Sequence, residues 1–292
     1  MSQNFTYPLP NFSDSKKSVT FWRYSRFWAR KLLYFSQINF FIKTLNEEKN
    51  NHLKYFFQER SYACYNVIRR FCDKSFSAND RVKTLLYDVD KGLKTFTFFP
   101  EKKNIFTLKD EENTFEIVLD QNHHVCEEGF WAIKLKFNTQ VILQASFCFT
   151  LENNILIACI QGYKHENLDS LKINKICTKK FFGLRPADLI IECIKILTKV
   201  LNCNATLGVY EKNQIRSKKG QSKGYYVNYQ KIWLENGGKL IKISKYKYYK
   251  LSHSRKKMEE IPSQKRSMYK KRFAILNEIE TNLNQIFLNN AS

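Results

Sequence analysis

The stretch from Cys177 to Glu211 constrains the fold most, because it predicts one long helix with a wide apolar face. Pro186 suits the first helical position, and Asp188 favours the positive end of a helix. Two apolar rows recur at the helical period: Leu189, Cys193, Ile196 and Val200, and Ile190, Ile194, Leu197 and Leu201. Residues 205–210 then have the pattern of a short strand. A helix packed onto a sheet is therefore expected in the middle of the fold.

A run of strands is predicted before this helix. Four segments are rich in β-branched and aromatic residues, and they are 114–119, 130–137, 141–150 and 154–162. Turn residues separate the last three, which predicts an antiparallel meander. Residues 239–251 alternate enough for one further strand, and residues 263–287 predict a last amphipathic helix. The fold class is therefore α+β, with a mostly antiparallel sheet and packed helices.

The N-terminal part of the chain predicts helices instead. We divide the chain into a helical portion over residues 1–95 and an α+β domain over residues 96–292, which ends in a basic helix. Residues 19–45 mix cations with large apolar side chains, which are Phe21, Trp22, Trp28, Leu32, Leu33, Phe40 and Phe41. Because proteins bury aromatic residues as a rule, docking on the core is the preferred expectation. A position in a membrane interface, with arginines at head-group level, is the alternative.

Positive charge is concentrated in the last third of the chain. Residues 212–273 contain 19 Lys and Arg against three Glu, and so hold 16 of the 22 net positive charges. This imbalance indicates an anionic partner, which is an acidic lipid head group, a phosphorylated glycan, a nucleic acid or an acidic protein. A lysine-rich surface that only contacts solvent is the alternative. Within this third, residues 212–224 lack an apolar period and predict a mobile basic loop.

The eight cysteines contain no CxxC pair, and several lie on predicted apolar faces. This use of cysteine is typical of small core residues in a reducing compartment. The first residues lack the charged-then-apolar pattern of a signal peptide, and no apolar run is long enough to span a bilayer. We therefore expect a cytoplasmic protein, with peripheral attachment to the inner membrane as an open option.

Six short segments of the chain resemble the VirK/YbjX family of Gram-negative bacterial proteins. In order along the chain these are Glu128-Gly129, 156–162, 178–189, 207–209, 229–238 and 261–276. The resemblance covers roughly residues 60–285. It implies a role in envelope integrity, virulence or tolerance of cationic antimicrobial peptides, and it implies no known reaction.

The chain departs from this family pattern where relatives tend to carry His or Asp. Cys64-Tyr65 stands in place of a His-Tyr pair, and Tyr210, Glu211 and Gln214 stand where relatives show a Ser-Asn-x-x-His type run. Asn228-Tyr229-Gln230 stands in place of Asp-Tyr-Asp. If those His or Asp groups transfer protons in relatives, this chain has lost them, which weakens an enzymatic interpretation.

The predicted order of a meander, a helix and a further strand is also similar to acetyltransferase (GNAT-like) architecture. That resemblance implies an acyl-CoA held between two splayed strands, with its pyrophosphate at a helix N-terminus. The glycine-rich pyrophosphate loop is missing before Pro186. Gly183 and Arg185 are partial substitutes that form a candidate anion site. The preferred alternative is that Arg185 pairs with an internal carboxylate while Gly183 turns the chain.

Other candidate sites are weaker. Lys265, Arg266, Lys270 and Lys271 fall on the start of the last helix and are candidate contacts for lipid head groups. Nucleic acid fits their charge less well, because no recognised binding motif surrounds them. His123-His124 and Cys126 have metal-ligand types but lack a second cluster at ligand spacing, so no metal site is assigned.

The sequence thus favours a basic, cytoplasmic, envelope-associated protein that binds an anionic membrane surface or envelope component without a cofactor. An acyltransferase acting on an envelope component is the alternative, and a nucleic-acid-binding protein is the third option. No catalytic residue is assigned, and whether the chain is an enzyme stays open.

Overall fold

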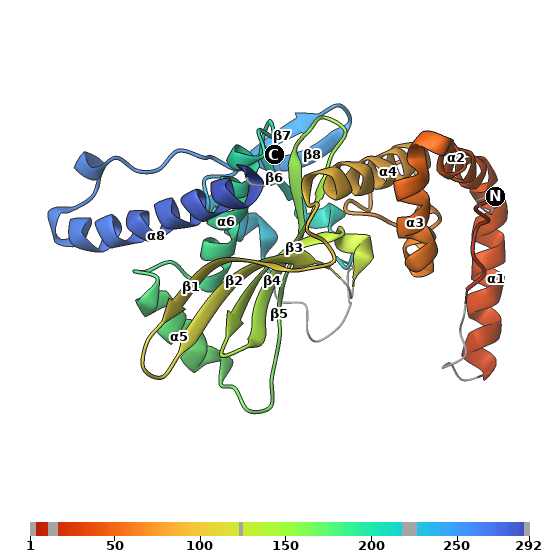
Figure 1. The fold of residues 1–292 in the computed structure, drawn as a ribbon. Coiled ribbons are helices and arrows are strands. Elements are labelled where there is room, and N and C mark those ends of the chain that lie inside the picture. Colours follow the sequence, from red (N-terminus) through yellow and green to blue (C-terminus); the bar gives the residue numbers. More distant parts are fainter. Residues whose placement is uncertain (1–3, 11–16, 123–124, 218–226, 289–292) are drawn as a thin grey trace.

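A computed structural model describes residues 4–10, 17–122, 125–217 and 227–288, with side chains in the first helix from Phe21 onward. The described residues form one eight-stranded sheet in the order β1-β2-β3-β4-β5-β6-β8-β7, which lies at the centre of Figure 1. The strands are β1 (Lys103–Lys109), β2 (Thr114–Gln121), β3 (Trp131–Phe137), β4 (Gln140–Phe149), β5 (Ile155–Gly162), β6 (Thr206–Val209), β7 (Lys239–Ile243) and β8 (Tyr246–Lys250).

Every neighbouring pair in this sheet is antiparallel except β5 and β6. β6 pairs with β5 only from Ile155 to Ile157, so the remaining residues of β5, as far as Gly162, extend beyond the shorter strand. The predicted meander over residues 130–162 is confirmed, because β3, β4 and β5 are consecutive antiparallel neighbours. The α+β class with a mostly antiparallel sheet is likewise confirmed.

Eight α-helices lie in the described residues, together with short 3-10 helices. They are α1 (Lys17–Leu33), α2 (Phe35–Leu45), α3 (Asn51–Glu59), α4 (Ala78–Thr95), α5 (Ser170–Lys180), α6 (Pro186–Val200), α7 (Tyr229–Glu235) and α8 (Ser263–Leu288). The 3-10 helices are η1 (Glu48–Asn50), η2 (Ser61–Val67), η3 (Cys126–Glu128), η4 (Glu211–Asn213) and η5 (Met258–Glu260).

The helix α6 is the predicted centre of the packing. Ile190, Ile194 and Leu197 have no exposed surface, and α6 contacts β3, β4, β5 and β6. α8 packs in turn on α6 and on β1, with Ile279 and Leu283 fully buried. The apolar periodicity was therefore sufficient to identify both buried faces.

The first helix contradicts the preferred expectation that its aromatic residues dock on the core. α1 stands at the edge of the molecule in Figure 1, and Phe27 is its buried aromatic anchor. Phe21, Trp22, Trp28, Leu32, Leu33 and, in α2, Phe40 are exposed, whereas Phe41 is buried. A helix at the edge of a domain can turn only one face toward the body. The face of α1 that contains Phe27 is turned inward, and the broader apolar face is turned outward. Among the described residues, no helix has the length and apolar content needed to cross a membrane.

Three further local expectations need correction. The strand β1 was not predicted. Residues 239–251 form the hairpin of β7 and β8 in place of one strand, because Ser244 adopts a left-handed φ of 53° that reverses the chain.

The predicted basic loop is described only up to Ser217. Its first part is held in place, since Arg70 donates to Ile215 O and Lys74 donates to Ser217 O. His123-His124 lie outside the described residues.

Candidate functional site

A surface hollow of about 930 Å³ lies where α5, α6, α7 and α8 meet. Its lining comes from all four helices and from β4, and consists of Leu143, Asn174, Lys175, Thr178, Lys179, Phe182, Gly183, Arg185, Pro186, Ala187, Asp188, Ile232, Glu235 and Met268. Two predicted anion-binding residues, Gly183 and Arg185, therefore line a real concavity. Volumes of this order hold small-molecule ligands in other proteins.

The turn between α5 and α6 shapes this hollow. Gly183 has a φ of +84°, which lies in the left-handed region that glycine adopts without steric cost. A Cβ at this position would also lie 2.8 Å from the Arg272 guanidinium of α8. Gly183 thus reverses the chain and leaves room for the guanidinium of Arg272.

Arg185 is engaged by carboxylates within the protein. Its Nε donates to Asp188 Oδ2 at 2.8 Å, and its guanidinium donates to Glu235 Oε2 at 2.7 Å. These hydrogen bonds raise the pKa of Arg185, with Asp188 contributing most. The structure therefore agrees with the preferred alternative, in which Arg185 pairs with a carboxylate, and leaves it little free charge for an external anion.

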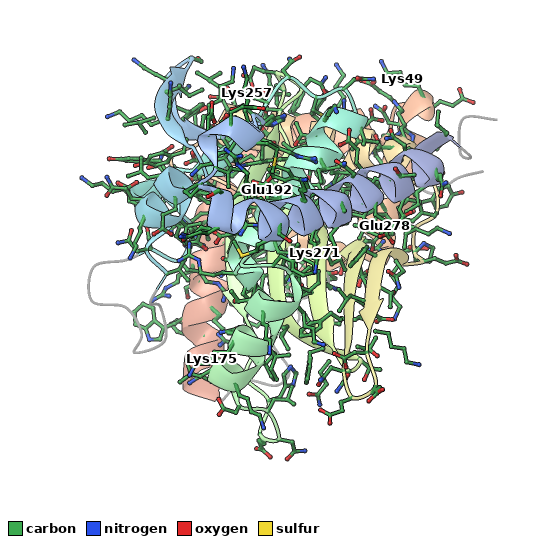
Figure 2. The ribbon with its side chains drawn as sticks, turned by 90° about the vertical axis from the view of Figure 1, so that its left-hand side faces the viewer. Lys49, Lys175, Glu192, Lys257, Lys271 and Glu278 are labelled. Atoms are coloured by element: carbon green, nitrogen blue, oxygen red, sulfur yellow. The ribbon has the colours of Figure 1, made fainter. Side chains whose placement is uncertain are left out.

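The start of α8 reaches the same hollow. Met268 lines it, Arg272 donates to the Phe182 carbonyl at 2.7 Å, and Lys271 Nζ lies 5.7 Å from the centre of the Phe182 ring. Of the predicted cations of α8, Lys271 is thus brought next to Phe182, which lines the hollow. Figure 2 shows it above Lys175 of α5 on the same side of the molecule.

None of the four predicted cations of α8 is among the residues that line the hollow. Arg266 donates to the carbonyl of Ile261, and Lys265 and Lys270 are exposed. Two cations that the sequence analysis missed, Lys175 and Lys179, do line it. They lie four residues apart on α5 and so share one helix face. That spacing was visible in the sequence, but the approach of α5 to α8 was not.

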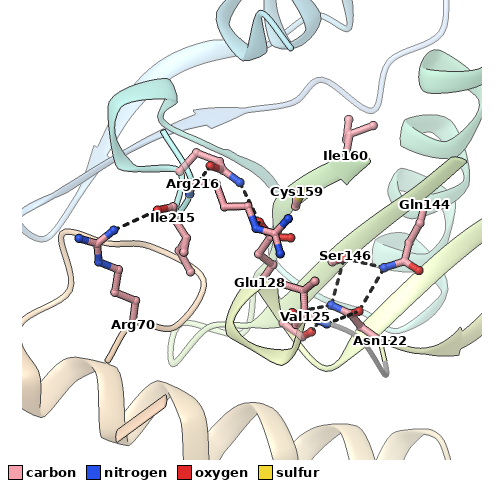
Figure 3. A network of polar contacts seen from close by, with 12 residues as sticks. Arg70, Asn122, Val125, Glu128, Gln144, Ser146, Cys159, Ile160, Ile215 and Arg216 are labelled. Carbon is pink, nitrogen blue, oxygen red and sulfur yellow. Dashed lines mark hydrogen bonds and ion pairs between the residues drawn. The ribbon is translucent and has the colours of Figure 1, made fainter. Parts of the chain in front are cut away.

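A second polar region lies inside the protein, close to the middle of the sheet (Figure 3). Asn122, which follows β2, donates to the carbonyls of Val125 and Gly129 and to Ser146 of β4. Gln144 of β4 donates to Asn122 and to Ser146. All three side-chain groups are buried. The network fixes the loop after β2 against β4.

Glu128 of η3 is the charged member of this region. Its side chain is 1 % exposed, and its Oε1 accepts from Gln214 at 3.1 Å and lies 3.4 Å from Arg216 Nε. Its Oε2 is buried and has no hydrogen-bond partner among the described residues. Burial raises the pKa of Glu128, while the neighbouring Cys159, Arg216 and Gln214 lower it. A buried carboxyl of raised pKa is a candidate proton acceptor.

Tyr229 of α7 closes the uncovered edge of β5 beside this network. Its hydroxyl accepts from the Ile160 amide at 2.9 Å and lies 3.5 Å from Cys159 Sγ. The ring is 1 % exposed, and Trp233, one turn later, donates to the Val209 carbonyl of β6. The space in which β5 and β6 separate is therefore occupied by side chains of α7.

Comparison with known proteins identifies the family of this chain. The family model described as "Protein of unknown function (DUF535)" matches residues 16–285. This chain belongs to the DUF535 family. The family is of the VirK/YbjX type, so the resemblance noted in the sequence is confirmed.

Relatives in the DUF535 family align over most of their length. An uncharacterised protein of Haemophilus influenzae is 33% identical over 292 residues, which covers 94% of this chain and 90% of the relative. A second uncharacterised protein of that organism is 28% identical, with 89% of both chains covered. A protein of Mannheimia haemolytica named "Membrane protein LapB" is 32% identical over 70% of this chain and 90% of its own. No solved structure matches the chain.

The pair Glu128-Gly129, one of the segments that carry the sequence resemblance, has a structural basis in this chain. Gly129 has a φ of +101°, and a Cβ there would lie 2.2 Å from the Phe147 carbonyl oxygen. Gly129 thus lets η3 approach β4 closely enough to place Glu128 in the buried network. Gln214 and Tyr229, which lie in two segments that depart from the family pattern, are both buried beside it.

Proposed function

We propose that this DUF535 protein binds an anionic amphiphile of the envelope, with an acidic head group and an apolar tail, in the hollow between α5, α6, α7 and α8. The observation that carries the proposal is the lining of that hollow. Leu143, Ile232 and Met268 offer apolar contact, while Lys175 and Lys179 offer positive charge at the surface. Head-group attraction and burial of the tail add together in such a site.

We further propose that the protein acts at the cytoplasmic side of the inner membrane, and that ligand binding supports envelope integrity and tolerance of cationic antimicrobial peptides. The name of the Mannheimia haemolytica relative supports a membrane link. The exposed cations of α8, Lys265, Arg266 and Lys270, support attraction to an acidic surface. A contribution to virulence follows from the same role.

Ligand extraction tests the proposal first. Protein purified under native conditions should release an acidic lipid that mass spectrometry identifies. A short-chain phosphatidylglycerol, kept below its micellar concentration, then serves as the probe in isothermal titration. Replacing both Lys175 and Lys179 by Gln should weaken binding about 30-fold, at about 1 kcal/mol for each cation. Ala187→Trp should weaken it too, because Ala187 lines the hollow and the larger ring would fill it.

Two exposed lysines near the hollow provide a matched control. Lys164 and Lys172 are exposed and do not line the hollow, so the double Gln variant removes the same charge from the same region. This control should bind the probe as the wild type does. Equal loss in both double variants would show only general charge attraction, and would count against the hollow as the site.

An acyltransferase is the second candidate, and one observation favours it. The buried carboxyl of Glu128 lies beside the place where β5 and β6 separate, which is where the acetyltransferase resemblance puts an acyl donor. Its proton affinity would suit removal of a proton from an acceptor amine or hydroxyl. Tyr229 already occupies that place, however, and the glycine-rich loop is absent. Binding of a ligand without chemistry therefore remains the leading proposal.

A further inference from the structure

We infer that α1 is a membrane-interface helix, whose outward apolar face enters the head-group region of an anionic phospholipid bilayer. This surface is separate from the hollow, and its function does not depend on a ligand there. The hollow would hold one amphiphile, whereas α1 would place the whole protein on the bilayer surface. α1 lies at the opposite edge of the molecule from α5 and α8 in Figure 1.

The apolar residues of α1 are far more exposed than is usual for such large side chains. Their exposed fractions are 67% for Phe21, 64% for Trp22, 47% for Trp28, 76% for Leu32 and 71% for Leu33. Isolated exposed hydrophobic residues need no explanation, but a contiguous set on one helix marks an interaction surface. Phe35 at the start of α2, exposed at 61%, continues the set.

Helical geometry places these residues together on the outer side of α1. At about 100° per residue, Phe21, Trp28 and Leu32 fall within about 40° of one another. Trp22 and Leu33 extend this face to an arc of about 140°, and the buried Phe27 lies outside the arc on the side of the body. The helix therefore presents a broad apolar face outward and keeps one aromatic ring as its anchor.

Positive charge borders this apolar face. Arg26, Arg30 and Arg23 follow one edge of the arc, and Lys31 lies beyond the other edge, with its Nζ 4.7 Å from the centre of the Trp28 ring. Residues 17–45 contain six Lys and Arg and no Asp or Glu. Partial burial lowers the pKa of Arg30, and the nearby charges of Arg69, Arg26 and Arg70 lower it further. The cations here are thus close enough to repel one another, which an anionic surface would relieve.

An anionic bilayer fits this surface better than other partners do. Tryptophan with flanking arginine is typical of helices that lie in the membrane interface, and five cations within α1 oppose a spanning position. A second copy of the chain would bring two cationic helices together without carboxylates to pair them. RNA would satisfy the arginines and could stack on the rings, but would leave Leu32 and Leu33 in contact with water.

Intrinsic fluorescence gives a direct test, because the four tryptophans divide into two classes. Trp22 and Trp28 lie on the proposed face, while Trp131 and Trp233 have no exposed surface. The full chain is mixed with vesicles of phosphatidylcholine and phosphatidylglycerol that carry brominated acyl chains. We expect a blue shift and quenching of the Trp22 and Trp28 emission, both reversed by salt. Vesicles of phosphatidylcholine alone should bind far more weakly.

Paired variants assign the effect to α1. Arg26→Gln with Arg30→Gln should weaken vesicle binding about 30-fold, on the basis of about one tenfold step per 1.4 kcal/mol. Leu32→Ala with Leu33→Ala should weaken it at least about tenfold, because both side chains leave water on binding. These residues are exposed, so the melting temperature should not change.

The matched controls lie on the edge strand β7 and on α5. Lys239→Gln with Lys242→Gln removes two exposed cations, and Leu171→Ala with Leu240→Ala removes two exposed leucines. Both controls should change vesicle binding less than about threefold, within the scatter expected for surface charge. The inference is overturned if the tryptophan emission does not respond to anionic vesicles, or if the α1 variants and the controls lose binding equally. Burial of α1 in a concentration-dependent dimer, or tighter binding to RNA than to vesicles, would overturn it as well.

Discussion

The hydroxyl of Tyr229 accepts a hydrogen bond from the backbone amide of Ile160 at 2.9 Å, which joins α7 to the edge of β5 that β6 leaves uncovered. Tyr229 thereby supplies a hydrogen-bond acceptor to a buried amide of β5 on the side where no strand pairs with it. The same contact occupies the place that an acyl donor would need. One hydrogen bond thus bears both on the stability of the fold and on the choice between the two candidate functions.

The first prediction concerns the stability of this contact. Tyr229→Phe keeps the ring but leaves the Ile160 amide buried without an acceptor, which should lower the free energy of unfolding by about 1–3 kcal/mol. Urea unfolding measures the change. Tyr55→Phe, on a side chain that is 64% exposed, is the matched control and should stay within about 0.5 kcal/mol of the wild type. Equal stability of both variants would show that water satisfies the Ile160 amide.

The second prediction separates ligand binding from acyl transfer. Because Tyr229 fills the space between β5 and β6 and Arg185 is held by Asp188 and Glu235, acyl-CoA affinity should be no better than millimolar, roughly −4 kcal/mol. Isothermal titration with acetyl-CoA and with a longer acyl-CoA measures it. Micromolar binding that disappears in Arg185→Ala, with an unchanged melting temperature, would contradict this prediction and favour the acyltransferase.

The third prediction concerns the core around α6. Ile194 has no exposed surface, so Ile194→Asp would bury a charge among apolar neighbours and should destabilise the protein by several kcal/mol, about 3 or more. Thermal unfolding followed by circular dichroism measures the effect. Leu171→Asp introduces the same charge at a position of α5 that is 74% exposed and should change little. A similar melting temperature for both variants would mean that α6 does not carry the core.

The fourth prediction concerns the pH dependence that Asp88 creates. Asp88 is fully buried, and its Oδ1 accepts from Trp131 Nε1 and from the Phe149 amide. Burial raises the pKa of Asp88 well above its usual value, although these hydrogen bonds oppose the rise. The folded protein therefore holds a proton that the unfolded chain releases at about pH 4, and the free energy of unfolding falls as pH rises above that value.

Asp88→Asn tests this sign. The amide keeps the acceptor oxygen and cannot ionise, so urea unfolding between about pH 5 and pH 8 should show a weaker loss of stability with pH than in the wild type. Asp80, at the start of the same helix, contributes to the free energy of unfolding with the opposite pH dependence. Hydrogen bonds from Lys245, Ser77 and Tyr246 lower its pKa to about 2, so its contribution is present above about pH 4 and is lost as pH falls towards 2. Asp80→Asn should therefore flatten the acid limb only. Identical pH profiles for Asp88→Asn and the wild type would contradict the buried-proton account.

Much of the fold could be predicted from local pattern. The apolar rows that include Ile190 and Ile194 identified α6 and its buried face, and alternation with turn residues identified β3 to β5. These signals are local, because helical and strand periodicities repeat within a few residues. The hairpin of β7 and β8 was missed for the same reason, since a non-glycine residue, Ser244, makes the turn and gives no strong signal.

The candidate sites depended on contacts between distant parts of the chain. The sequence determined that Arg185 stands at the start of a helix near Asp188, but only the folded chain brought Glu235 to it, 50 residues later. Likewise, the charge of the last third was evident, yet Lys271 reached Phe182 only because α8 packs on α6.

What the sequence by itself determined was therefore which residues form each element and which faces are apolar. Tertiary structure decided which of those faces found a partner. The wide apolar face of α6 is covered by the sheet and α8, whereas that of α1 is largely exposed among the described residues, although both have helical apolar spacing. The physical reason is that burial needs a matching surface at the right place in space, and periodicity along one helix carries no information about where that surface lies.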